Sequence, residues 1–150
     1  MSTEQVHQPR IVIVGAGFGG LLAARGLANV PAKVTVIDKS NFHLFQPLLY
    51  QIATATLSPA DIAQPIRSIL HHQANTEVLM AEVLGVDTRT REVRFSEGNV
   101  PYDYLILATG AHHGYFGHEE WEPLAPGLKS ISDGTQIRTK ILMAFECAEM

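Results

Sequence analysis

Residues 10–38 read RIVIVGAGFGGLLAARGLANVPAKVTVID, and this stretch decides the fold. An apolar burst at 11–14 has the length of a short buried strand, and apolar residues at helical spacing follow over 18–29. Val30-Pro31 ends that helix, and a short connection leads to a second apolar burst at 34–37. A strand, a helix and a second strand in this order predict a βαβ unit, from which parallel sheets are built.

The turn between the first strand and the helix carries glycines in the spacing G-x-G-x-x-G. Gly15 permits the tight turn, Gly17 lets the backbone approach a pyrophosphate without a Cβ in the way, and Gly20 allows close packing of the helix. The helix N-terminus adds free N–H groups and a partial positive charge, which stabilise phosphates by up to about 2 kcal/mol. The turn therefore predicts a dinucleotide-binding site.

Asp38 ends the second strand, 18 residues after Gly20. An acid at about this spacing accepts hydrogen bonds from an adenosine ribose, and the alternative is a solvated acid at a strand end. A carboxylate here disfavours a 2′-phosphate, which argues against NADP. FAD and NAD both stay open, because each carries a pyrophosphate and an unphosphorylated adenosine ribose.

The remaining sequence predicts a parallel sheet with an antiparallel β-meander in place of one crossover helix. A third parallel strand is expected over 77–82, and three short antiparallel strands over 83–87, 92–95 and 100–102. The nearly all-apolar run at 104–108 is suited to the buried middle of a parallel sheet. The predicted fold class is α/β, a Rossmann-like FAD/NAD(P)-binding domain.

Two further helices are predicted outside this sheet. Ser58 and Pro59 form a helix start that Pro65 interrupts, and a final helix is expected over 134–149. Between them, Trp121 is expected to be a packing anchor under the loop at 115–126.

Composition limits the function classes. The 150 residues, 46% hydrophobic, suit one domain with a proper core, and a net charge of −4 argues against nucleic acid as a partner. No apolar run approaches the roughly 18 residues of a membrane span. Residues 1–9 lack the apolar stretch of a secretory signal and predict a disordered leader. Cys147 is the only cysteine, which excludes an intramolecular disulfide and favours the cytoplasm.

The βαβ unit, the meander and a strand ending in Ala108-Thr109-Gly110 together resemble the FAD domain of flavoprotein oxidoreductases that bind two dinucleotides. Within that group, residues 41–51, NFHLFQPLLYQ, are similar to a segment typical of type II NADH dehydrogenases, the NADH:quinone oxidoreductases. Residues 108–111, 115–117 and 141–146 are similar to that family as well. The resemblance covers residues 10–149.

The resemblance implies FAD as cofactor, NADH as hydride donor and a quinone as electron acceptor. The flavin then carries the redox chemistry, so no side chain is predicted to be a catalytic acid or base and no metal is expected. The implied contacts are Gly15, Gly17, Phe18, Gly19 and Gly20 with the pyrophosphate, Asp38 and Lys39 with the ribose, the main chain of Val83 with the adenine, Gln46 and Pro47 with the isoalloxazine, and Ala108, Thr109 and Gly110 with the phosphate side of the flavin.

Members of this family carry further parts that this sequence does not contain: a second glycine motif for NADH, a segment completing the FAD domain, and a C-terminal region contacting membrane and quinone. We therefore expect a piece of a longer enzyme, a naturally short protein being the alternative. Residues 10–111 would form the first segment of the FAD-binding domain, and 112–150 would lead toward the NADH-binding domain. Alone, the chain should not oxidise NADH, and it should hold FAD only weakly because part of the pocket is missing. Uncovered apolar surface should favour a homodimer.

Several alternatives stay open. Another flavin reductase, of ferredoxin reductase or sulfide:quinone oxidoreductase type, would share this architecture, although the latter should carry more cysteines. A non-catalytic dinucleotide-binding module is also compatible. Gln46 could bond only to loop backbone. Residues 48–52 fit either a core or the wall of a quinone route.

Histidines do not form a predicted metal site. The adjacent pairs at 71–72 and 112–113 are expected to diverge, and no cysteine or acid completes a tetrahedral set. His43 is the one histidine expected near the flavin.

Overall fold

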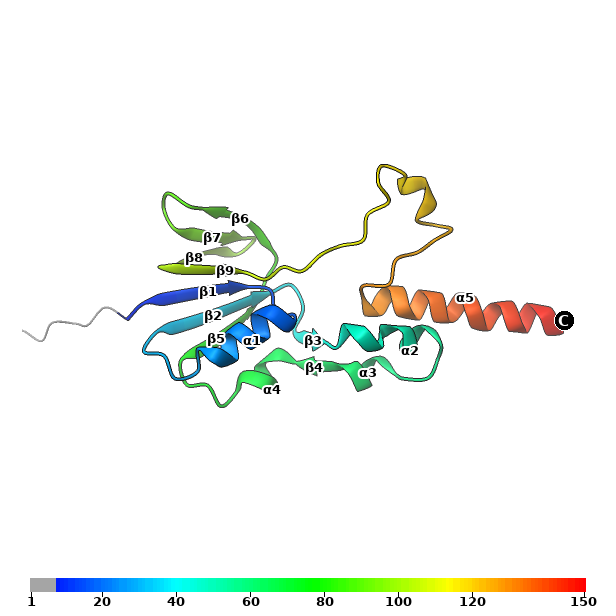
Figure 1. Ribbon diagram of the computed structural model, residues 1–150, viewed down its shortest axis with the longest axis horizontal. Helices are drawn as coiled ribbons and strands as arrows, with labels where there is room; N and C mark the ends of the chain where they lie inside the picture. Colours follow the sequence, from blue (N-terminus) through cyan, green and yellow to red (C-terminus); the bar gives the residue numbers. More distant parts are fainter. Residues whose placement is uncertain (1–7) are drawn as a thin grey trace, which may run out of the picture. The chain divides into compact units, whose positions relative to one another are not determined.

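The computed structural model describes residues 8–150, which form two compact units (Figure 1). Unit 1 holds the described residues up to His43 together with Pro65–Gly110, and unit 2 holds Leu44–Gln64 and Ala111–Met150. The boundary between residues 110 and 111 lies beside the one expected from the sequence, while the inserted stretch 44–64 joins the second unit. Most of the predicted leader, residues 1–7, lies outside the described residues.

Unit 1 is built on a four-stranded sheet in the order β5-β2-β1-β9. Each neighbouring pair runs parallel, and in the middle of β1 Ile13 lies between Val36 and Ile106. This confirms the predicted parallel sheet. The strands are β1 (Arg10–Val14), β2 (Lys33–Asp38), β5 (Thr76–Met80) and β9 (Tyr104–Leu107).

Two helices cover one face of this sheet. They are α1 (Phe18–Gly26) and α4 (Ile66–Leu70), and they pack on alternate residues of β1 and β2 (Figure 1). Ile11 and Ile13 share this face with Val34 and Val36, because the register pairs them and side chains alternate along a strand.

The meander covers the opposite face. It consists of β6 (Val83–Asp87), β7 (Glu92–Phe95) and β8 (Gly98–Pro101), which pair antiparallel as predicted. Val93 of β7 is fully buried with Val12 and Ile37 of the main sheet. Since both faces of β1 and β2 are covered, their sequences are continuous apolar runs rather than alternating ones.

β9 lies at an edge of the sheet, and the prediction of a buried middle strand is wrong. Within the described residues only β1 pairs with β9. Tyr104 and Leu107 are each 64% exposed. An apolar run identifies a strand, but it does not reveal whether a neighbour lies on both sides.

The C-terminal end of α1 is held by amide side chains that precede β5. Asn75 Nδ2 donates to the carbonyls of Leu27, Val30 and Ala32 at 2.9, 3.1 and 3.2 Å. Gln73 Nε2 donates to a carbonyl inside α1 at 3.0 Å. These bonds tie the segment before β5 to the end of α1 and to the turn that follows it.

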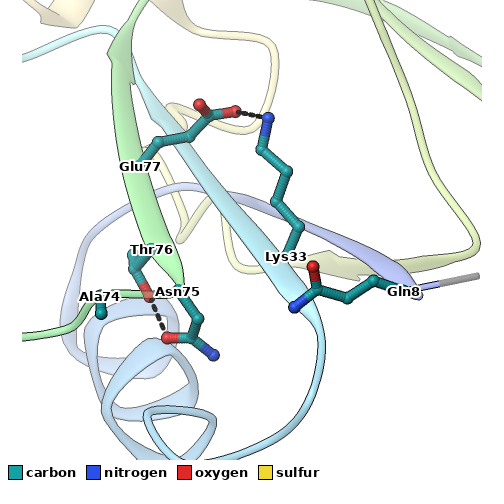
Figure 2. Close-up of a pocket in the computed structure, with 6 residues that line it drawn as sticks. All are labelled: Gln8, Lys33, Ala74, Asn75, Thr76 and Glu77. Carbon is teal, nitrogen blue, oxygen red and sulfur yellow. Dashed lines mark hydrogen bonds and ion pairs between the residues drawn. The ribbon is translucent and has the colours of Figure 1, made fainter. Parts of the chain in front are cut away.

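A polar hollow lies at the amino ends of β2 and β5, opposite the glycine turn (Figure 2). Lys33 Nζ lies 3.3 Å from Glu77 Oε1, which also accepts a 2.8 Å hydrogen bond from Thr35. Ligands of open parallel sheets bind at the carboxyl ends of the strands, so this hollow is not where a dinucleotide is expected. It is lined by Gln8, Lys33, Ala74, Asn75, Thr76 and Glu77.

Unit 2 is mostly helical and has a small core of Leu49, Ile52 and Ile62. The chain enters and leaves it through two short paired strands, β3 (Phe42–Leu44) and β4 (Ala63–Pro65). Its helical elements are η1 (Gln46–Leu48), α2 (Leu49–Ala53), α3 (Pro59–Ile62), η2 (Glu119–Trp121) and α5 (Ile131–Glu149).

The helix start predicted at Ser58 is confirmed. Pro59 is the first residue of α3, and the N–H of Ser58 donates to Asp61 Oδ2 at 2.7 Å. This backbone hydrogen bond lowers the pKa of Asp61 below its usual value. At Pro65 the chain is extended, and the helix restarts as α4, as the sequence predicts.

α5 begins at Ile131, three residues before the predicted start, because Ser130 and Asp133 form a capping box. The N–H of Asp133 donates to Ser130 Oγ at 3.1 Å, and Asp133 Oδ2 accepts the N–H of Ser130 at 2.9 Å. Burial raises the pKa of Asp133, but the N–H donors of Lys129 and Ser130 outweigh it and bring the pKa below its usual value.

Two predictions about aromatic side chains are wrong. Trp121 is 48% exposed and stacks on His118 with ring centroids 4.3 Å apart, so it is no buried anchor. The loop is closed instead by Tyr115 Oη, which donates to the carbonyl of Ala125 at 2.7 Å. The rings of His71 and His72 lie 3.5 Å apart rather than diverging. Both follow the short helix α4, where the backbone turns.

Across residues 8–150, no helix combines the length and apolar character required to cross a bilayer.

Candidate dinucleotide-binding site

Gly15 begins the turn after β1, and two features require glycine there. Its φ is +97°, and a Cβ would collide with the carbonyl oxygen of Ala108. Its N–H donates to the carbonyl of Ile37 at 2.7 Å. The turn is therefore held between the carboxyl ends of β2 and β9, where a parallel sheet binds its ligands.

Gly20 is required by packing inside the same turn. It is buried, and an added Cβ would collide with the carbonyl oxygen of Gly15 and lie 3.3 Å from the Cβ of Ala108. The first turn of α1 can lie this close to the strand ends only without a side chain at position 20. This confirms the packing role expected from the motif.

Gly17 has neither requirement. Its φ is −67°, which any residue adopts, and beyond its neighbours in the chain no atom of residues 8–150 lies within 4 Å of where its Cβ would stand. The residue is exposed, and so are Phe18 and Gly19 beside it. Folding of the chain leaves this glycine unexplained, whereas a ligand lying directly against the backbone would explain it.

The start of α1 can receive an anion at this point. Gly17 is the N-cap and carries no side chain to cap the helix. The first N–H groups of a helix have no intrahelical acceptor, and they carry the positive end of the helix dipole. With exposed glycines at 17 and 19, the backbone is accessible to a diphosphate, and the residues present fit the phosphate groups of a dinucleotide.

Asp38 ends β2 beside this turn and holds its backbone. Oδ2 accepts the N–H of Ala16 at 2.6 Å, and Oδ1 accepts the N–H of Ser40 at 2.7 Å. Each carboxylate oxygen can accept a second hydrogen bond, which leaves capacity for ribose hydroxyls. Lys39 beside it is exposed. Ribose binding by these two residues stays a prediction.

His43 of β3 contacts the turn through its Nδ1, which lies 2.9 Å from the carbonyl oxygen of Ala16. Its ring also meets the ring of Phe18 edge-on, with centroids 5.2 Å apart. We expected this histidine near the flavin but not in contact with the glycine turn. No local pattern signals the contact, because 27 residues separate His43 from Ala16.

The chain after β9 lies against the turn. The N–H of Ala108 donates to the carbonyl of Val14 at 2.8 Å, and its methyl group faces the first residues of α1. Gly110 follows Thr109 with a φ of +74°. The structure thus brings Ala108 to the glycines, while contact of residues 108–110 with a ligand stays a prediction.

Val83 is the first residue of β6, as the strand expected over 83–87 predicts. β5 ends at Met80, and the N–H of Ala81 then donates to the carbonyl of Asp38 at 2.9 Å. The chain therefore leaves the sheet beside Asp38, two residues before Val83. Adenine binding by its main chain stays a prediction.

Gln46 and Pro47 belong to unit 2, where they begin η1. Gln46 is half-buried and Pro47 exposed. Their contact with an isoalloxazine stays a prediction. In the neighbouring stretch 48–52, Leu49 and Ile52 are core residues, whereas Tyr50 is 53% exposed.

Residues 9–143 match the family model of the pyridine nucleotide-disulphide oxidoreductases. The chain belongs to this family. The resemblance seen in the sequence and the predicted fold class are both confirmed.

Among curated proteins, the type II NADH:quinone oxidoreductase NdhA of Mycobacterium tuberculosis is 47% identical over 145 residues, covering 94% of this chain and 31% of that protein. The Ndh enzyme of the same organism is 44% identical, covering 97% of this chain and 33% of that protein. The chain spans about a third of the length of the curated relatives it matches.

Two solved structures are similar to the chain. NDH2 from Plasmodium falciparum in complex with NADH has a TM-score of 0.82 at 28% identity, covering 96% of this chain and 31% of that one. The sulfide:quinone oxidoreductase of Aquifex aeolicus has a TM-score of 0.84 at 26% identity, covering 92% of this chain and 32% of that one.

Proposed function

We propose that the chain is the N-terminal FAD-binding part of a flavoprotein oxidoreductase that passes hydride from NADH to FAD and electrons on to a quinone. When bound, the flavin supplies the hydride and electron transfer. The chain's own residues bind and orient it, with the turn at 15–20 receiving the diphosphate and Asp38 receiving the ribose.

Gly17 is the observation that carries this proposal. Gly15 and Gly20 are explained by the fold alone, so they would be glycines in a protein that binds nothing. Gly17 is explained by neither backbone conformation nor packing. A diphosphate in contact with the backbone gives this position its physical reason.

The relatives support the donor and the acceptor in the proposal. The two mycobacterial relatives are NADH:quinone oxidoreductases by name, and the similar Plasmodium structure was determined with NADH. Because the chain spans about a third of their length, we propose that NADH oxidation requires the remaining parts and that these 150 residues alone are inactive.

The similarity to a sulfide:quinone oxidoreductase supports a second candidate, the same part of a sulfide-oxidising flavoenzyme. Such an enzyme is expected to carry several cysteines near its flavin. Cys147, the only cysteine of the sequence, is exposed near the end of α5. Identities of 47% against 26% also favour the NADH enzymes.

Homodimer formation, peripheral membrane contact outside this chain and a cytoplasmic location stay predictions. Apolar side chains exposed on α5 support self-association, among them Ile141, Leu142 and Phe145. Light scattering at increasing concentration measures it directly.

The proposed function is tested by titrating the purified chain with FAD and following flavin fluorescence, with mass analysis of any ligand retained through purification. We expect FAD binding in preference to NADP. We also expect Gly17→Ala to weaken FAD binding at least about tenfold, because its Cβ would occupy the space of the diphosphate. Gly26→Ala, at the other end of α1, is the matched control and should bind as wild type.

Retention of NAD without flavin would overturn the flavin assignment. Equal FAD affinity of Gly17→Ala and wild type would overturn the placement of the diphosphate. Quinone reduction with NADH by the isolated chain would contradict the proposal that it is inactive alone.

A further inference from the structure

We infer that His43 is a positioning residue for the bound dinucleotide, because it fixes the peptide that carries the N–H of Gly17. This inference rests on the proposed function and adds a residue to it. His43 lies outside the glycine motif and the strand-end acid, and it acts through the turn rather than by touching the flavin.

Two successive peptides of the turn are each held by one side chain. Asp38 Oδ2 accepts the N–H of Ala16, which fixes the peptide between residues 15 and 16. His43 Nδ1 lies 2.9 Å from the carbonyl oxygen of Ala16, which fixes the peptide between residues 16 and 17. Ala16 itself is 1% exposed, so water cannot replace these partners without opening the turn.

The peptide between residues 16 and 17 presents its N–H in a fixed direction. In a trans peptide the C=O and the following N–H point in opposite directions. With the carbonyl of Ala16 turned toward His43, the N–H of Gly17 points away from His43. Gly17 is exposed and lies at the start of α1, where a diphosphate would be received.

This orientation is set before a ligand binds. Glycines on either side of Ala16 leave the backbone of the turn free to rotate unless something holds it. A binding loop held in its bound conformation loses less conformational entropy when the ligand binds. The edge-on contact with Phe18, the first residue of α1, ties the same histidine to the helix start.

The contact also defines a proton position. A carbonyl oxygen only accepts, so Nδ1 of His43 must carry a proton. The neutral side chain is then the Nδ1–H tautomer, with Nε2 as an acceptor. The chemical shifts of the two ring nitrogens in an NMR spectrum report this tautomer, which a histidine without the contact has no reason to adopt.

The test uses three variants that separate the donor from the ring. His43→Asn places an amide nitrogen near the position of Nδ1, and His43→Gln places one near the position of Nε2. His43→Phe keeps a ring against Phe18 and removes the donor. His72→Asn, at an exposed histidine after α4, is the control. Each is measured by its FAD dissociation constant and, without ligand, by hydrogen exchange of the Ala16 amide, which donates to Asp38.

We expect His43→Phe to bind FAD about five- to tenfold more weakly than wild type and to exchange the Ala16 amide faster, as loss of one hydrogen bond predicts. His43→Asn should restore binding to within about twofold, and His43→Gln should not. His72→Asn should match wild type in both measurements.

Wild-type affinity in His43→Phe would overturn the inference and leave the proposed function standing. Equal weakening in His43→Asn and His43→Phe would also overturn it, because the ring rather than the donor would then matter. A wild-type chain that binds no FAD would overturn the proposed function. In that case unchanged amide exchange in His43→Phe would overturn the role of His43 in the turn, and faster exchange would uphold it.

Discussion

Unit 1 and unit 2 bury their apolar residues to very different extents. In unit 1, β1 and β2 are covered on both faces, and Val12, Ile13 and Val36 are fully buried. In unit 2 three residues form the core, and the second half of α5 leaves large apolar side chains in solvent, Phe145 at 69% exposure among them. The unit with the complete core is the one that carries the glycine turn.

This difference explains where a binding site can be held in place. The turn at 15–20 is fixed by Ile37 on one side, by Ala108 on the other and by Asp38 and His43 from within unit 1. Its position follows from a sheet buried on both faces, and a rigid scaffold of this kind positions loops that bind ligands. The stability of unit 2 depends more on α5, a helix with a capping box, and on a core of only three buried residues among those described.

The largest effect is expected from truncating the core of unit 1. Ile13→Ala removes a fully buried side chain between the sheet and the helices α1 and α4 and should cost about 2–5 kcal/mol of unfolding free energy. Ile141→Ala in unit 2, where the side chain is 38% exposed, should cost clearly less, about 1 kcal/mol or below. Urea denaturation followed by circular dichroism measures both, and equal costs would contradict the difference between the units.

A second prediction contrasts two glycines of α1. Gly20→Ala should cost about 3 kcal/mol, because its Cβ would collide with backbone that cannot move aside. Gly26→Ala has open space and should stabilise the protein by up to about 1 kcal/mol. The two thermal unfolding midpoints should shift in opposite directions. A rise of both midpoints would show that the turn is looser than described.

A third prediction concerns the end of the same helix. Asn75→Ala removes the donor shared by three carbonyls and should cost about 1–2 kcal/mol, which denaturation in urea detects. Asn99→Ala, at an exposed position of β8, is the control and should change the free energy of unfolding by less than about 0.5 kcal/mol. Equal effects of the two substitutions would show that the side chain of Asn75 does not fix the end of α1.

The smallest effect is expected in unit 2 and depends on pH. The pKa of Asp133 is lower in the folded chain than its ordinary value of about 3.9. Its stabilisation of the start of α5 is therefore complete above that value and is lost as the pH falls through the folded pKa. Helicity measured by circular dichroism should decline in this acid range, and Asp133→Asn should reduce helicity at neutral pH and remove that decline.

Glu146→Gln, on the exposed part of α5, is the control for Asp133→Asn and should show the same decline of helicity in acid as wild type. An acid profile of Asp133→Asn that matches wild type would show that the capping box contributes nothing to α5.

Much of unit 1 could be predicted because its signals are local. The strand, glycine turn, helix and second strand follow one another within 29 residues, and the meander follows from the short turns between its strands. The edge position of β9 could not be predicted, because a run of apolar residues does not identify its neighbours.

The partners of the turn were predictable only in part. The place of Asp38 at the end of β2 follows from its spacing, but its bond to Ala16 depends on the curvature of the turn. The contact of His43 with the same residue arises from tertiary structure alone. In unit 2, α5 begins three residues before the predicted start because Ser130 is its N-cap.

We propose that the turn at Gly15–Gly20 receives a dinucleotide. The most direct test is a titration of the ¹⁵N-labelled chain with FAD, followed by the amide resonances in NMR spectra. We expect the largest shifts at Gly17, Phe18 and Gly19. Largest shifts at Lys33 and Glu77, in the polar hollow at the amino ends of β2 and β5, would contradict this proposal.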